Sequence, residues 1–116
     1  MDQDPRPPID VEGALQIALG DRDFLKELIR LFVAETDPAI ESLKGAVQQG
    51  QAEMVMKIAH SLKSSSGNLH ALAVRDCAYE LEKMGRSRQL DRAREVLETL
   101  QREYLRLRTY TNSLML

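Results

Sequence analysis

The strongest constraint on the fold is a row of apolar residues near the end of the chain, spaced alternately three and four positions apart. The row consists of Leu90, Ala93, Leu97, Leu100, Tyr104 and Leu107. A helix turns by about 100° per residue, so this spacing gathers all these side chains into one narrow stripe. Such a stripe is the seam that a helix presents to its neighbours in a bundle. We therefore expect the longest helix of the chain here.

Earlier segments show similar apolar spacing, and each is expected to be helical. Their approximate ranges are residues 11–19, 22–48, 51–69 and 72–85. Pro38 falls inside the second range, where it predicts a kink in a nearly continuous helix. Long amphipathic segments joined by short loops predict an all-α fold, an antiparallel up-down four-helix bundle with a short N-terminal extra helix at one end.

The length of 116 residues suits one domain with one hydrophobic core. We expect the bundle to occupy residues 9–110. The opening "MDQDPRPPID" contains several prolines, so residues 1–8 are expected to form a flexible N-terminal tail or linker, and residues 111–116 a C-terminal tail. No apolar run approaches the roughly 18 residues that span a bilayer, and the N-terminus has no signal-peptide stretch. A soluble, cytoplasmic protein is therefore expected.

Charge and cysteine content narrow the possible partners. The formal net charge of -2 gives no general attraction to nucleic acid or to an anionic membrane. An arginine-rich stretch from Arg86 onward keeps a nucleic-acid-binding last helix as a minor alternative. The single Cys77 excludes an intramolecular disulfide and a multi-cysteine zinc site.

One histidine occupies an unusual place in the third expected helix, within "AHSLKSSSGNLHAL" at residues 59–72. On a helical wheel the apolar stripe of this helix includes Leu62 and Leu69, whereas His60 lies about 160° from Leu62. His60 is therefore expected to be exposed. Several residues share its side of the helix: Lys57, Lys63, Ser64 and Gly67.

The serines and the glycine in this stretch are a poor choice for stability alone. Glycine in a helix interior costs about 0.5–1 kcal/mol relative to alanine, and serine is only a moderate helix former. Small side chains on the exposed side leave room for another molecule to approach the helix around His60. We interpret the stretch as clearance for a docking partner.

The chemistry open to His60 is limited by what the rest of the sequence lacks. His60 and His70 are ten residues apart without a cysteine pair or an H-x-x-x-H spacing, so no metal site is expected. There is no nucleophile elbow for hydrolysis, and no phosphate-binding glycine loop for ATP. A neutral imidazole is itself a competent nucleophile. A phosphoryl group on it would be balanced by Lys63, with Lys57 and Ser64 nearby.

The stretch "AHSLKSSSGNL" at residues 59–69 resembles the phosphorylation motif of histidine-containing phosphotransfer (HPt) domains. The resemblance extends over about residues 9–108, because the order of the helices, the proline in the second long helix and the "CAYELE" stretch at 77–82 also match. It implies a monomeric bundle that accepts a phosphoryl group on His60 from a receiver-domain aspartate and passes it to, or takes it back from, another response-regulator receiver domain. Receiver domains of response regulators or hybrid sensor histidine kinases are the implied partners.

Carried over by position, the resemblance makes His60 the phosphoacceptor and Lys63 its charge partner. It makes Ser64 and Gly67 close-approach positions, with Lys57 at the same docking face, and Arg86 a loose match to a residue that flanks the phosphoryl group. No autokinase activity and no cofactor are expected in this chain, because the receiver contributes the Mg²⁺ site.

The sequence departs from the family pattern at two places. Ser64 stands where glycine is frequent, and His70 stands where the family often has another glycine. His70 is either an ordinary helix-end residue, favourable to the helix dipole, or a residue that adjusts partner choice. The alternative function is a non-catalytic helical adaptor with a degenerate site.

Overall fold

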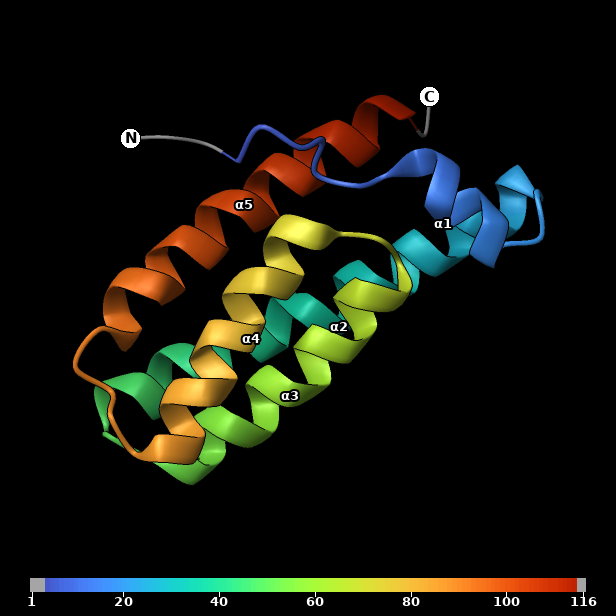
Figure 1. Ribbon diagram of the computed structural model, residues 1–116. Coiled ribbons are helices and arrows are strands. Elements are labelled where there is room, and N and C mark those ends of the chain that lie inside the picture. The colour runs from blue at the N-terminus through green and yellow to red at the C-terminus, as the bar shows by residue number, and fades with distance from the viewer. Residues whose placement is uncertain (1–3, 115–116) are drawn as a thin grey trace.

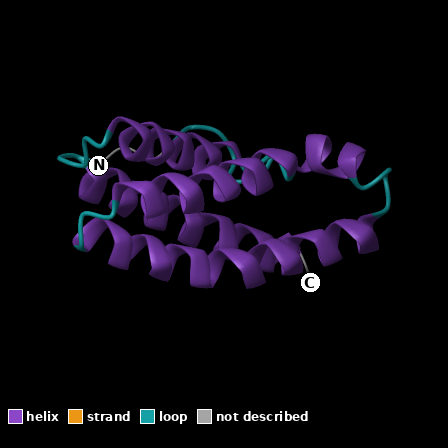
Figure 2. Cartoon of the chain, turned by 90° about the horizontal axis from the view of Figure 1, so that it is seen from below, coloured by secondary structure: helices purple, strands orange, loops and turns teal. Residues whose placement is uncertain are grey.

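The structure is a computed structural model that describes residues 4–114, and every regular element in that range is a helix. The five helices are α1 (Val11–Ile17), α2 (Arg22–Gln48), α3 (Ala52–Asn68), α4 (Leu72–Ser87) and α5 (Ala93–Leu114). Figure 1 shows α2 to α5 as the long members of the bundle and the short α1 at one end. Seen from below, the long helices lie lengthwise along the molecule (Figure 2). The predicted all-α bundle with an extra N-terminal helix is confirmed.

The core is built from the apolar stripes that the spacing predicts. In α5, Leu97, Leu100, Tyr104 and Leu107 are all buried. The helix begins at Ala93 rather than near residue 90, because Leu90 belongs to the preceding turn, where its carbonyl accepts a hydrogen bond of 3.0 Å from the backbone N–H of Ala93. Leu90 is nevertheless half-buried against the core.

Helix α2 runs without interruption through Pro38, as expected for a nearly continuous helix. With 27 residues it is longer than α5, which has 22, so the expectation that the last helix is the longest is wrong. Pro38 has no backbone N–H, so the carbonyl four residues earlier has no helical donor. Next to this gap, the Tyr104 hydroxyl donates to the side chain of Asp37 at 2.5 Å and lies 3.3 Å from the carbonyl of Val33. The Tyr104 ring also meets Phe32 edge to face, with 6.4 Å between centroids. These contacts join α5 to the proline region of α2.

The backbones of helices α3 and α4 approach each other closely at Gly85. A Cβ atom built on Gly85 would lie 2.6 Å from the backbone nitrogen of Met56 and 2.7 Å from the carbonyl oxygen of Ala52. Both neighbours are backbone atoms, which cannot move aside as a flexible side chain does. Gly85 therefore sets the distance between α3 and α4, which Figure 1 shows side by side.

We expect Gly85→Ala to lower the free energy of unfolding by at least about 2 kcal/mol, because the added methyl group forces two helix backbones apart. Thermal or urea unfolding followed by circular dichroism measures this loss. Gly45→Ala is the matched control, since no atom lies within 4 Å of a Cβ built at that helical position. A Gly85→Ala variant as stable as the parent protein would show that the two helices separate at no cost.

Residues 4–8 lie along α4 and α5 before α1 begins. The Arg106 guanidinium donates to the carbonyls of Asp4 and Arg6, at 3.1 and 3.0 Å, and Arg6 pairs with Asp76 of α4 at 2.8 Å. The flexible tail expected over residues 1–8 thus makes specific contacts over residues 4–8, and residues 1–3 lie outside the described part. Helix α5 likewise continues to Leu114, into the expected C-terminal tail.

Among the described residues, no helix combines the length and the apolar character that a membrane crossing requires.

Candidate functional site

His60 lies on the exposed side of α3, and one of its ring nitrogens is hydrogen-bonded to a buried carboxylate. Its side chain is 57% exposed, and Nδ1 lies 2.7 Å from Oε2 of Glu82 on α4. Leu62 and Leu69 are buried, as the wheel predicts, and Val55 and Ser66 are buried with them. The helix is therefore anchored to the core on one side and presents His60 on the other.

Glu82 is the centre of a small ion cluster at this position. Its side chain is only 4% exposed, and Lys63 Nζ lies 2.6 Å from Oε1, while an Arg86 guanidinium nitrogen lies 2.8 Å from Oε2. Burial raises the pKa of Glu82, but the close Lys63 ammonium and the hydrogen bond to the His60 ring outweigh it, so the pKa falls below its ordinary value. Glu82 is ionised at neutral pH.

The ionised carboxylate determines how the His60 ring can react. A carboxylate only accepts hydrogen bonds, so Nδ1 of His60 must be the donor, which assigns the proton of the neutral ring to Nδ1. Nε2 then carries the lone pair and points away from Glu82, on the exposed side. If Nε2 attacks an electrophile, positive charge grows on the ring, and the carboxylate next to Nδ1 stabilises it.

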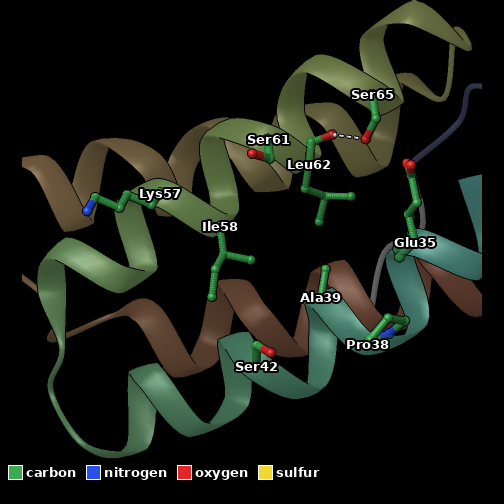
Figure 3. A pocket seen from close by; sticks show the side chains of 10 residues that line it. Glu35, Pro38, Ala39, Ser42, Lys57, Ile58, Ser61, Leu62 and Ser65 are labelled. Carbon is green, nitrogen blue, oxygen red and sulfur yellow. Dashed lines mark hydrogen bonds between the residues drawn. The ribbon is translucent and has the colours of Figure 1, made fainter.

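Next to Ser61, which follows His60 in the chain, α3 and α2 enclose an open groove of about 550 Å³ (Figure 3). Its α3 wall includes Lys57, Ser61 and Ser65, and its α2 wall includes Glu35 and Ser42. The Ser65 hydroxyl donates to the carbonyl of Leu62 within its own helix, at 3.2 Å. Ile58 and Leu62 from α3 and Pro38 from α2 also line the groove, so it combines polar side chains with an apolar floor.

The structure places two of the other predicted residues on this side of α3. The Lys57 ammonium lies 3.5 Å from the Glu53 carboxylate, one turn earlier, and stays mostly exposed. Ser64 is exposed and lies one turn after His60. Both flank His60, and neither contacts the Glu82 cluster directly in the described part of the chain.

Gly67 is less open than the wheel predicts. It is half-buried, and a Cβ atom built there would lie 3.3 Å from Cδ of Arg75 on α4. The Arg75 side chain crosses the glycine and is held by Asp76, with hydrogen bonds of 3.1 and 2.8 Å. The wheel shows only which side of α3 the glycine faces, whereas the covering arginine comes from a neighbouring helix.

His70 lies after the end of α3 and turns toward α1 rather than along the exposed face of His60. Its backbone is left-handed, with φ of 59°, and its carbonyl accepts a hydrogen bond of 3.0 Å from the backbone N–H of Asp10. Its ring lies against Gly13, where a Cβ atom would come within 2.5 Å of Nδ1. His70 therefore connects the α3–α4 turn to α1, and its influence on partner choice stays a prediction.

Four of the seven arginines from Arg86 onward, Arg86 among them, pair with acidic side chains of the described residues. Arg92 pairs with Glu95, Arg106 with the buried Glu103, and Arg108 with Asp37. These contacts give the arginines a structural use, and nothing in their arrangement favours nucleic-acid binding.

Two residues at this position were not predicted from the sequence as site residues: Glu82, and Tyr79 on α4, whose ring centroid lies 5.0 Å from the Lys63 ammonium. Glu82 was noted only as part of "CAYELE", where two glutamates alternate with apolar residues on an amphipathic helix. One available signal was Gly85, three residues later and hence on the same face of α4. A glycine that lets two helices approach also brings the residues next to it against the partner helix.

The comparisons with known proteins concern the family and the fold of the chain. The sequence model of the Hpt domain family matches residues 27–110. The chain is a member of the Hpt domain family. No curated protein sequence matches it. Among solved structures, it is similar to the crystal structure of histidine-containing phosphotransfer protein B from Pseudomonas aeruginosa PAO1. The TM-score is 0.85 with 28% identity, over 92% of this chain and 93% of that one.

Membership of the Hpt family gives the protein a role in two-component phosphorelays, in which Hpt domains work with kinase and receiver partners. The fold of this Hpt domain holds one histidine exposed with a carboxylate beneath it. Within residues 4–114, no group of three or more His, Cys, Asp or Glu side chains is placed to hold a metal ion.

Proposed function

We propose that this Hpt domain carries a phosphoryl group on Nε2 of His60, taking it from the phosphoaspartate of one receiver domain and passing it to another. The observation that carries the proposal is the 2.7 Å bond between Nδ1 and the buried Glu82, because it directs the lone pair of the exposed nitrogen outward. Glu82 accepts the hydrogen bond from Nδ1, Lys63 balances the charge of the phosphoryl group, and the receiver supplies the Mg²⁺ site.

The proposed step is a displacement at phosphorus. The Nε2 lone pair forms the N–P bond while the P–O bond to the aspartyl carboxylate breaks, and the electron pair of that bond stays with the carboxylate. The Nδ1 proton remains between the ring and Glu82, so no proton has to leave during the transfer. The reverse step returns the phosphoryl group to a receiver aspartate, and the direction of net flow depends on the partners.

The receiver is proposed to dock over His60 and the adjoining α2–α3 groove (Figure 3). Lys57 and Ser64 are exposed and lie about one turn before and one turn after His60 on α3. Positioning and electrostatics dominate phosphoryl transfer, so a close fit of the partner is worth more than additional groups on this chain.

The proposal is tested by incubating the protein with receiver domains that have been phosphorylated by a small-molecule phosphodonor. We expect label on the Hpt domain that is lost in acid and survives alkali, as an N–P bond requires. An adaptor with a degenerate site binds a receiver without becoming labelled. Absence of label with every receiver of the source organism would contradict the proposal.

The clearance around α3 leads to a further prediction, for Gly67→Gln. The Arg75 side chain over Gly67 is flexible at its end, so we expect the free energy of unfolding to stay within about 1 kcal/mol. The longer side chain obstructs the docking face, and transfer from a receiver is expected to slow by about tenfold or more. Gly67→Ala is the matched control and should transfer near the parent rate. Equal rates for all three proteins would remove the clearance explanation.

A further inference from the structure

Tyr79 lies beside the ion cluster around Glu82, and the transfer step proposed above does not use it. It is on α4, its side chain is 48% exposed, and the Lys63 ammonium lies 5.0 Å from the centroid of its ring. The ammonium of Lys83 approaches the same ring at 4.5 Å. An exposed aromatic ring with two cations over it is an unusual surface feature, and it adjoins the lysine paired with Glu82.

The register of α4 explains why Tyr79 and Glu82 meet the same lysine. They are three residues apart, so they lie on one face of the helix, one turn from each other. Lys63 reaches across from α3 and is contacted by the carboxylate at 2.6 Å and by the ring at 5.0 Å. A cation within about 6 Å of a ring centroid is attracted to the electron-rich face of the ring. Lys63 is thus held from two directions.

The two attractions differ in how much they restrict the ammonium. The ion pair with Glu82 fixes one short contact, whereas the attraction to the ring is spread over its face. A phosphoryl group on Nε2 of His60 requires Lys63 to turn from Glu82 toward new negative charge. The lysine side chain is long and flexible, so without a second contact its ammonium would leave the Glu82 cluster and be hydrated by solvent. A ring face lets the ammonium shift while remaining near His60.

We propose that Tyr79 is a positioning residue for phosphoryl transfer, whose ring keeps the Lys63 ammonium beside His60 as the phosphoryl group arrives. The inference rests on the proposed function, because it needs His60 to be the acceptor. The positioning effect depends on the face of the aromatic ring, which Tyr79→Phe retains. Tyr79→Leu keeps an apolar side chain of moderate size and removes the ring.

Transfer rates at saturating receiver concentration test the inference in a double-mutant cycle. We expect Tyr79→Leu to slow transfer about threefold to fivefold and Tyr79→Phe to transfer at the parent rate. In a Lys63→Met background, Tyr79→Leu should have no further effect, since the ring then has no lysine to position. If the ring instead contacts the receiver directly, Tyr79→Leu should slow transfer equally in both backgrounds and raise the half-saturating receiver concentration. That result would overturn the inference.

Two further measurements separate positioning from a general surface effect. Lys83→Met removes the other cation from the same ring, and because Lys83 pairs with Glu80 at 3.1 Å rather than with Glu82, transfer should change less than twofold. In proton NMR, the ε-methylene protons of Lys63 should resonate upfield through the ring current, and this shift should disappear in Tyr79→Leu. An unshifted Lys63 in the parent protein would overturn the inference. Failure of the parent protein to accept phosphate would instead be a failure of the proposed function.

Discussion

His60→Gln is expected to abolish labelling of this Hpt domain by phosphorylated receivers, with a loss of at least about a thousandfold in transfer rate. A glutamine amide has no nucleophilic lone pair comparable with that of imidazole, so no N–P bond forms. The fold should be retained, because His60 is more than half exposed and Glu82 keeps its contacts to Lys63 and Arg86. Labelling and thermal unfolding of the same preparation measure both effects.

The chain offers a matched control for this substitution, because His70 is its only other histidine. His70→Gln alters the contact with α1 but leaves the exposed face of His60 unchanged, so the variant should still be labelled. Acid-labile label that persists in His60→Gln, or that disappears in His70→Gln alone, would assign the chemistry to a different residue.

Glu82→Ala is the second substitution with a large expected effect. It removes the acceptor of the Nδ1 proton, so the ring no longer favours the tautomer with its lone pair at Nε2, and it releases Lys63 from the cluster. We expect transfer to slow by about tenfold to a hundredfold, by analogy with the loss found when the carboxylate that orients a metal-binding histidine is removed. The free energy of unfolding should fall by about 1–2 kcal/mol, since the cations left behind regain water.

The stability that Glu82 contributes should depend on pH in a defined direction. Its pKa is lowered in the folded protein, so the contribution is complete above the ordinary value of 4.5 and is lost as the pH falls through the folded pKa. The stability difference between the parent protein and Glu82→Ala should therefore be constant near neutrality and shrink below about pH 4.5. A difference that grows on acidification would contradict an ionised Glu82.

Glu82→Gln separates the role of charge from the role of the hydrogen bond. The amide oxygen can still accept from Nδ1, while the charge that holds Lys63 and Arg86 is lost. We expect transfer to fall less than in Glu82→Ala. Transfer at the parent rate in Glu82→Ala would show that the carboxylate has no part in preparing His60.

The helices could be predicted from the sequence because each has a single apolar stripe. The spacing in α5 and the stripe of α3 around Leu62 correctly indicate which side of each helix is buried, and the exposure of His60 follows directly. The boundaries were less certain where a turn carries an apolar residue, as at Leu90. The tail was expected to be free because its prolines disfavour helix, but prolines do not prevent a segment from packing, as residues 4–8 do.

Only part of the site could be predicted from the sequence, for a physical reason. Residues on one helix, such as His60 and Lys63, are related by the fixed geometry of that helix. Glu82 and Tyr79 come from a second helix, and their distance from His60 depends on how closely α3 and α4 approach. That approach is set at Gly85 by contacts with the backbone of residues 52 and 56, which no periodicity along the chain specifies.

The most direct test of the account is to identify the atom of the phosphorylated Hpt domain that carries the phosphoryl group. Protein labelled with ¹⁵N in its histidine rings is phosphorylated by a receiver, and the coupling between ³¹P and the ring nitrogens is recorded by NMR. We expect a single N–P bond, at Nε2 of His60, with Nδ1 still protonated against Glu82. A phosphoryl group on Nδ1 of His60, or on any other residue, would contradict it.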